Sequence, residues 1–231
     1  VNERRLSMKR VLSIQDISCI GKCSLTVALP IISAMGIETS ILPTSILSTH
    51  TMFNDFTFRD LTDDMEPIKK HWQKEGFSFD AIYTGYLGSE KQITLVKDYF
   101  KTFGNTCKYI IVDPAMADNG KLYSGFDKDF PLKMAKLCKY ADVILPNISE
   151  AAFMTGMPYP GENASNECIK DLLLSLAKLG SKKIVITGVE SADHKFGFMG
   201  YDSETKEFFE YYTPKVQMKS HGTGDVFAST F

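Results

Sequence analysis

The stretch ADVILPNISE, residues 141–150, combines two patterns that together decide the fold. Its first part, ADVILPN (141–147), carries a short and nearly continuous apolar run, which is typical of a strand buried on both faces of a parallel sheet. Asn147 then stands three residues before Glu150, the spacing of a capping box at a helix N-terminus. The stretch therefore predicts a buried strand that leads directly into a helix.

The same alternation recurs along the chain. Further strand-like runs occupy residues 9–16, 38–44, 80–86, 108–114 and 182–188. Between them, residues 89–103 and 165–179 repeat apolar side chains at three- and four-residue spacing, and Ser89 with Gln92 forms another capping-box pattern. Strands that alternate with helices predict an α/β fold, a three-layer α/β/α doubly wound domain with a mostly parallel sheet.

Two segments depart from this rhythm. Residues 48–61 alternate polar with aromatic side chains, and residues 195–213 contain two strand-like stretches around the turn-forming DSETK. The second segment predicts an antiparallel hairpin beside the sheet. Because no repeat, low-complexity tract or linker divides the chain, we expect residues 1–231 to form a single domain.

Charge and hydropathy narrow the class of protein. The chain has 26 Lys and Arg against 28 Asp and Glu, so no basic excess is available to hold a nucleic acid or an anionic membrane. A small-molecule partner is favoured. No apolar run reaches the roughly 20 residues of a membrane span, and VNERRLSMKR lacks the apolar centre of a secretory signal. We expect a soluble, cytoplasmic protein in which residues 1–7 are an extension ahead of the fold.

The five cysteines indicate a reducing compartment. Cys19, Cys23, Cys107, Cys138 and Cys168 are odd in number and contain no CxxC pair. This spacing favours neither a disulfide framework nor a zinc site. We expect them to be mostly core residues.

Polar residues follow the predicted strands. Asp16, Tyr86, Asp113, Asn147 and Thr187 stand where successive strands end. In open α/β sheets, ligands bind beyond the carboxyl ends of the strands, because loops and helix N-termini converge there. The sequence thus predicts that these side chains share one edge of the sheet.

The segment HGTGD, residues 221–225, has two interpretations. It can be a simple turn in which Asp225 caps the next helix. Alternatively, the amides of Gly222, Thr223 and Gly224 form an anion hole for a transferring phosphoryl group, while Asp225 accepts the proton of the attacking alcohol. Because a helix N-terminus stabilises negative charge, we expect this carboxylate to remain ionised.

Two acidic segments also allow both a structural and a functional interpretation. Asn147 and Glu150 can act only as a helix cap, or they can also orient waters around a magnesium ion. DPAMAD places Asp113 and Asp118 on one loop, as a surface turn or as part of a site.

Other familiar motifs fail. The segment IGKCS is no phosphate-binding loop, since Asp16 replaces the first glycine and Cys23 replaces the final Ser or Thr. The four histidines lack metal-ligand spacing, and no GxSxG elbow is present.

Seven motifs together resemble the pyridoxal kinases of the ribokinase-like superfamily. They are VLSIQD, PTSILSTHT, TGYLG, VDPAMAD, LPNISEA, VITG and HGTGD, in that order from about residue 9 to the end of the chain. The resemblance implies transfer of the ATP γ-phosphoryl group to the 5′-hydroxymethyl of pyridoxal, pyridoxine or pyridoxamine. It also implies magnesium, a monovalent cation and a homodimer.

The resemblance assigns roles to fourteen residues. It makes Asp225 the base and Gly222, Thr223 and Gly224 the anion hole, and it places Asp113, Asn147 and Glu150 around magnesium and the phosphates, with Asp118 and Thr187 beside the nucleotide. It places Asp16, Cys23, His50, Thr51 and Tyr86 around the pyridine ring.

Three departures from the family pattern qualify these roles. Asp16 stands where many pyridoxal kinases have serine, and Met52 with Phe53 replaces an expected glycine with an aromatic residue. Only seven residues follow Gly224, so we expect the protein to continue beyond this sequence. Two alternatives remain open: a hydroxymethylpyrimidine kinase, and a non-catalytic binder of a vitamer or nucleotide.

Overall fold

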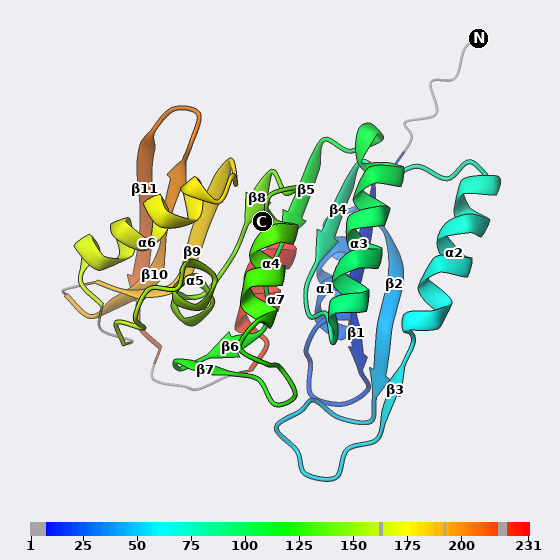
Figure 1. Cartoon of the computed structure of the whole chain (residues 1–231), viewed down its shortest axis with the longest axis horizontal. Coiled ribbons are helices and arrows are strands. Elements are labelled where there is room, and N and C mark those ends of the chain that lie inside the picture. The colour runs from blue at the N-terminus through cyan, green and yellow to red at the C-terminus, as the bar shows by residue number, and fades with distance from the viewer. Residues whose placement is uncertain (1–7, 162–163, 192, 217–220) are drawn as a thin grey trace.

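A computed structural model describes residues 8–161, 164–191, 193–216 and 221–231, and the predicted extension at residues 1–7 lies outside them (Figure 1). Its main sheet has nine strands in the order β11-β10-β9-β8-β5-β4-β1-β2-β3. The six predicted strands are confirmed as β1 (Arg10–Ser18), β2 (Glu38–Leu47), β4 (Ala81–Thr84), β5 (Tyr109–Val112), β8 (Val143–Ile144) and β9 (Lys183–Glu190). All six run parallel to their neighbours within this set.

Antiparallel strands lie at both edges of this parallel centre. The predicted hairpin is confirmed: β10 (Lys195–Asp202) pairs with β11 (Glu207–Pro214) and with β9. At the opposite edge, the irregular segment 48–61 ends in the short strand β3 (Phe58–Asp60), antiparallel to β2. A separate small sheet pairs β6 (Ala117–Asp118) with β7 (Lys121–Leu122).

Helices cover both faces of the sheet, which confirms the three-layer α/β/α fold (Figure 1). The front layer contains α2 (Thr62–Lys74), α3 (Glu90–Phe103), α4 (Phe130–Cys138), α5 (Ile148–Thr155) and α6 (Asn166–Lys178), and the 3-10 turn η1 (Gly104–Thr106) follows α3. Behind the sheet lie α1 (Leu25–Ala34) and α7 (Thr223–Thr230) (Figure 1).

Two apolar cores separate the layers. The larger joins the front helices to strand residues such as Leu12, Ile14 and Ile82, all fully buried. The smaller packs Ala28 and Ala228, from α1 and α7, on the back of the sheet. Burying a Leu or Ile side chain contributes roughly 1.5–3 kcal/mol, so the front core dominates stability.

The capping predictions are confirmed in one helix and only half confirmed in another. Asn147 and Glu150 form the full capping box of α5. At α3, Ser89 accepts from the backbone of Gln92 as predicted, but the Gln92 side chain does not return the bond. Its Oε1 accepts instead from Gly88 N at 2.8 Å, one residue ahead of the N-cap, while its buried Nε2 donates to the carbonyl of Thr44 at 3.0 Å and links α3 to the sheet.

The prediction for the cysteines was wrong in part. All five are free thiols, but only Cys138 is buried, while Cys19 and Cys168 are exposed. The exposed pair lies just past the end of β1 and in the first turn of α6, where one side faces solvent. Among the described helices, none is long and apolar enough to cross a bilayer.

Candidate active site

One large cavity lies at the carboxyl ends of the parallel strands. Its lining includes Asp16 of β1 and Tyr86 just past β4, the two neighbouring strands at which the chain switches from building one half of the sheet to the other. Its volume is about 710 Å³, within the usual range for small-molecule sites. In Figure 1 this is the lower edge, which carries the β6–β7 hairpin and the chain leading into α7.

The structure brings together every residue that the sequence singled out. The cavity is lined by Asp16, Cys23, His50, Thr51, Tyr86, Asp113, Asp118, Asn147, Glu150, Thr187, Gly222, Thr223, Gly224 and Asp225. These side chains come from seven separate segments of the chain. Their convergence follows from the parallel sheet, which places the ends of successive strands at one edge.

The start of α7 lines this cavity with backbone N–H groups that have no backbone partner among the described residues. Gly222 is the N-cap residue and adopts a left-handed conformation, with φ 73°. The first helical bond runs from Val226 N to the Gly222 carbonyl at 2.9 Å, so the amides of Thr223, Gly224 and Asp225 precede it without intrahelical partners. Such a helix N-terminus favours an anion.

Asp225, in the first turn of this helix, has an unusual carboxyl group. Burial raises its pKa to about 6, a hydrogen bond from the Ser24 backbone opposes the rise, and the negative charge of Asp16 adds to it. With this pKa the carboxyl group is still mostly ionised at neutral pH, as expected, although desolvation makes it easier to protonate than an exposed aspartate. A carboxyl with this pKa is a better proton acceptor than an exposed aspartate.

The cavity concentrates negative charge. Burial, followed by the charges of Glu150 and Asp225, raises the pKa of Asp113 well above its usual range. Burial also raises the pKa of Glu150 to about 8, against three backbone hydrogen bonds that lower it. The described lining residues include five carboxylates but neither Lys nor Arg. A cation is therefore the natural counter-charge here.

Asn147 and Glu150 are held by their neighbours. Asn147 Oδ1 accepts from Glu150 N at 2.9 Å, and Glu150 Oε2 accepts from Asn147 N at 2.8 Å. Glu150 Oε1 also accepts from Met116 N at 3.1 Å, and Asn147 Nδ2 donates to the Ala117 carbonyl at 2.7 Å. The capping interpretation is thus confirmed, and it fixes both side chains against the loop that follows β5.

The donor set fits magnesium only through water and phosphate. Among residues 8–161, 164–191, 193–216 and 221–231, no group of three or more His, Cys, Asp or Glu side chains is arranged to hold a metal directly. Mg²⁺ usually keeps several waters and binds one or two carboxylates together with substrate phosphates. Asp113 and Glu150, both deeply buried at the cavity floor, are suited to that arrangement.

A second group of side chains surrounds Asp16. Asp16 is only 4% exposed and accepts from Ser18 Oγ at 3.2 Å. Burial raises its pKa, while hydrogen bonds from Ser24 and Ser18 lower it. Burial likewise raises the pKa of Tyr86 to about 12 and of Cys23 to about 11, and the charge of Asp16 contributes to both shifts. This end of the cavity offers a carboxylate with neutral phenol and thiol groups beside it.

His50 closes the same end. Its ring lies 4.8 Å from that of Phe53 and 5.4 Å from that of His221, between ring centroids. Gly21 permits the close approach of His50, because a Cβ at residue 21 would lie 2.0 Å from His50 Cδ2. The loop 48–57 thereby packs against the loop that follows β1.

The sequence analysis missed an aromatic wall on the other side of the cavity. Phe196 and Phe198 from β10, Tyr211 from β11 and Phe227 from α7 all line it. Phe198 pairs with Tyr211 across the hairpin, and its ring lies 5.3 Å from that of Phe227. The alternation of Phe196 and Phe198 was a usable signal, since residues two apart share one face of a strand.

The cluster of buried acids predicts an inverted dependence of stability on pH. Because the folded-state pKa values of Asp113, Glu150 and Asp225 lie above their unfolded values, the folded protein binds more protons, and its stability falls as pH rises from about 5 to 8. Surface carboxylates such as Asp63 and Asp80 have lowered pKa values and stay ionised throughout this window.

We expect the ligand-free protein to melt several degrees higher at pH about 5.5 than at pH about 8, since one pKa unit is worth roughly 1.4 kcal/mol. Calorimetry at constant ionic strength measures this. A melting temperature that falls on acidification across this window would contradict the assignment.

Comparisons with known proteins agree with this geometry. The sequence pattern of a family described as phosphomethylpyrimidine kinase matches residues 38–231. The chain is 39% identical to a candidate phosphomethylpyrimidine kinase from Bacteroides thetaiotaomicron crystallised with pyridoxal, with a TM-score of 0.90 over 96% of this chain and 78% of that one. It is 34% identical to pyridoxal kinase from Lactobacillus plantarum, with a TM-score of 0.87 and the same coverage of 96% and 78%.

A further relative is also named a pyridoxal kinase. Pyridoxal kinase PdxY of Actinobacillus pleuropneumoniae is 27% identical over 188 residues, which is 78% of this chain. The chain spans 63% of the length of that relative.

Proposed function

The chain belongs to the phosphomethylpyrimidine kinase family, and within it we propose that this protein is an ATP-dependent pyridoxal kinase. It transfers the γ-phosphoryl group of ATP to the 5′-hydroxymethyl group of pyridoxal, pyridoxine or pyridoxamine, giving the 5′-phosphate. The observation that carries this proposal is Asp225: a carboxyl with a raised pKa, in the first turn of a helix whose free amides face the same cavity.

Asp225 acts as the general base for the vitamer alcohol. An alcohol is far too weak an acid to lose its proton to a carboxylate in the ground state. It acidifies as the O–P bond forms, and a base with a pKa of about 6 then accepts the proton more readily than an ordinary aspartate. No covalent intermediate with the protein is required.

The amides at the start of α7 stabilise the transferring group. Thr223 N and Gly224 N belong to the unpaired first turn, and Gly222 sets their direction through its left-handed backbone. They donate to the equatorial oxygens of the phosphoryl group, where negative charge concentrates during transfer. The aligned dipoles of α7 add to this stabilisation.

Magnesium would supply the positive counter-charge that the lining residues of the cavity lack. We propose that Asp113 and Glu150 hold its waters near the phosphates and that Asn147 orients Glu150 through the capping box. When bound, the ion neutralises charge on the nucleotide phosphates. A monovalent cation would also balance the negative charge of the five carboxylates in the described lining.

The vitamer and the nucleotide bind at opposite ends of the cavity. Asp16 and Tyr86, with Cys23, His50 and Thr51, hold the vitamer ring. The nucleotide lies at the opposite end, beside Asp118, Thr187 and the aromatic wall of Phe196, Phe198 and Tyr211. The carboxylate of Asp16 favours a ring or substituent that carries a proton.

A spectroscopic assay tests the proposal. The full-length protein with ATP, magnesium and pyridoxal is expected to produce pyridoxal 5′-phosphate, followed by its absorbance. Hydroxymethylpyrimidine is the competing substrate to include, since the family is named for pyrimidine phosphorylation. A higher kcat/KM for hydroxymethylpyrimidine than for pyridoxal would make the protein a hydroxymethylpyrimidine kinase. Binding of the vitamer in calorimetry without any turnover would make it a non-catalytic binding protein. We further propose that the protein is cytoplasmic and forms a homodimer. Light scattering of the purified protein measures its oligomeric state.

A further inference from the structure

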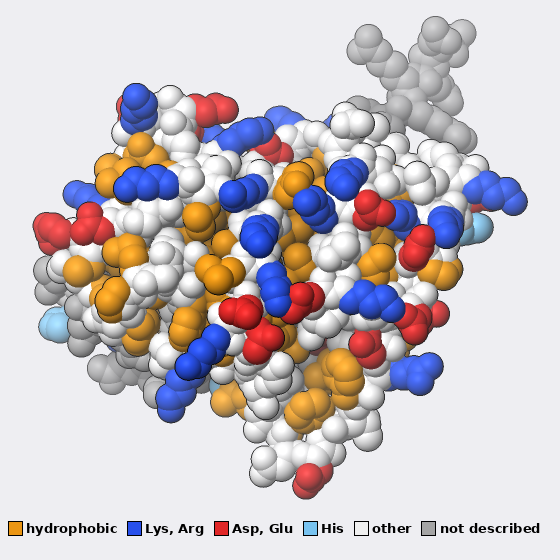
Figure 2. Space-filling model, in the orientation of Figure 1, with side chains coloured by type: hydrophobic (Ala, Val, Ile, Leu, Met, Phe, Trp, Pro, Cys, Tyr) orange, Lys and Arg blue, Asp and Glu red, His pale blue; other side chains and the backbone are white. Residues whose placement is uncertain are grey.

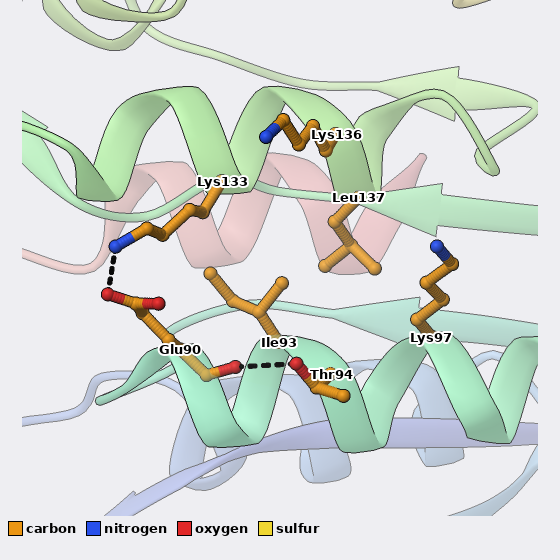
Figure 3. A pocket seen from close by; sticks show the side chains of 7 residues that line it. All are labelled: Glu90, Ile93, Thr94, Lys97, Lys133, Lys136 and Leu137. Carbon is orange, nitrogen blue, oxygen red and sulfur yellow. Dashed lines mark hydrogen bonds and ion pairs between the residues drawn. The ribbon is translucent and has the colours of Figure 1, made fainter.

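A second, smaller cavity lies on the front of the molecule, away from the active site. It is a groove of about 170 Å³ between α3 and α4, lined by Glu90, Ile93, Thr94, Lys97, Lys133, Lys136 and Leu137 (Figure 3). The α3 residues follow the spacing of one helix face, as do those of α4. Because α3 and α4 pack side by side on the sheet, the two faces form its walls.

The two ends of this groove differ in charge. At one end, Lys133 Nζ forms an ion pair with Glu90 (Figure 3). Asp127 and Asp129 also act on Lys133, so that lysine is fully compensated. Lys97 lies at the other end, and Lys136 lies on the α4 wall between the two ends (Figure 3). Neither lysine has a carboxylate partner among the described residues.

Tyr140, beside Lys97 at the far end of the groove, lies in a region of positive charge. Lys97 Nζ lies 4.5 Å from the centroid of the Tyr140 ring. A hydrogen bond from Lys97, then the charges of Lys97, Lys101 and Lys139, hold the pKa of this exposed phenol below its usual value. Figure 2 shows blue side chains gathered over this part of the front face. The region is thus basic, although the whole chain carries a net charge of -2.

We propose that the α3–α4 groove binds a phosphate group, free or as a small monoester, between Lys97 and Lys136. The uncompensated ammonium groups supply the charge, whereas the Thr94 hydroxyl on the same wall donates to the Glu90 carbonyl at 3.1 Å. The volume of about 170 Å³ lies below the roughly 300–1,000 Å³ that is usual for small-molecule pockets, so the groove suits a single phosphate group better than a nucleotide. This site is separate from the proposed kinase reaction and does not depend on it.

Lysine acetylation in the presence of phosphate tests the proposal. The full-length protein is treated with a limiting acetylating reagent in sodium phosphate, in glycerol 3-phosphate, and in sodium chloride at equal ionic strength. Mass spectrometry then gives the rate at each lysine. Phosphate is expected to slow Lys97 and Lys136 several-fold and to leave Lys70 and Lys74, on α2, unchanged. Protection by glycerol 3-phosphate at lower concentration would identify the monoester as the ligand.

A pair of double variants provides the control. Lys97→Gln/Lys136→Gln is expected to lose one phosphate site by calorimetry, whereas Lys70→Gln/Lys74→Gln removes the same charge from α2 and should retain it. Equal slowing of all lysines, or the same stoichiometry in both double variants, would overturn the groove as a binding site. The active-site cavity does not confuse the protection measurement, because its described lining contains no lysine.

Discussion

Asp225→Asn is expected to lower kcat for pyridoxal phosphorylation by about 10²–10⁴-fold, the usual contribution of a general base. The amide cannot accept the proton of the vitamer alcohol, yet it keeps the shape of the side chain. Because burial raises the pKa of Asp225 to about 6, the wild-type kcat/KM should also fall below about that pH, and this limb should be absent from the residual activity of the variant. Steady-state rates across pH measure both effects, while calorimetry should show vitamer binding largely intact.

The matched control is Asp171→Asn, the same chemical change at an exposed position of α6. It should leave kcat and its pH profile unaltered. Removing the desolvated charge of Asp225 should not lower the melting temperature, so lost activity cannot be attributed to unfolding. If Asp225→Asn abolished binding but spared turnover of the bound vitamer, Asp225 would be a binding residue and the base would lie elsewhere.

Gly222→Ala is expected to lower kcat by about 10²–10³-fold, comparable to the loss of one oxyanion donor. Residue 222 has φ 73°, and an added Cβ would lie 2.4 Å from the carbonyl oxygen of Lys22. That oxygen belongs to backbone and cannot rotate away as a side-chain tip would. The turn must therefore shift, and the amides of Thr223 and Gly224 move away from the transferring phosphoryl group. Turnover at saturating ATP and vitamer measures the loss.

Gly156→Ala separates backbone strain from displacement of these amides. Gly156 ends α5 with φ 69°, and an added Cβ there meets nothing within 4 Å. This variant should cost about 1 kcal/mol in stability and leave kcat unchanged. Should Gly222→Ala show the same stability loss with wild-type kcat, the amides at the start of α7 would have no part in phosphoryl transfer.

The sequence predicted most of the frame because its signals are local. The six parallel strands, the edge hairpin and the α5 capping box follow from residues that are neighbours along the chain. Errors arose where the outcome depends on distant partners. Gln92 has the right spacing for a capping box, but its side chain accepts from Gly88 N rather than from Ser89 N and also donates to Thr44 of β2. Cys19 and Cys168 are of a residue type that is often buried, yet the chain around them faces solvent.

The candidate residues could likewise be selected from the sequence, because the ends of parallel strands must meet at one edge of the sheet. Only part of the aromatic wall could be predicted in the same way: the alternation places Phe196 and Phe198 on one strand face, but Phe198, Tyr211 and Phe227 meet only when the hairpin folds beside α7. The same holds for the α3–α4 groove, whose lysines are scattered in the sequence.

The sequence by itself therefore determined the order of strands and helices, a turn at HGTGD, and the fourteen candidate residues that meet in the cavity. Only the tertiary structure decided how readily these groups gain or lose protons. Asp225 lies in the first turn of α7 and stays mostly ionised at neutral pH, but burial, with the nearby charge of Asp16, raises its pKa to about 6. The physical reason is that the free energy of a charge depends on how much water and which other charges surround it, and neither is set until distant segments pack together.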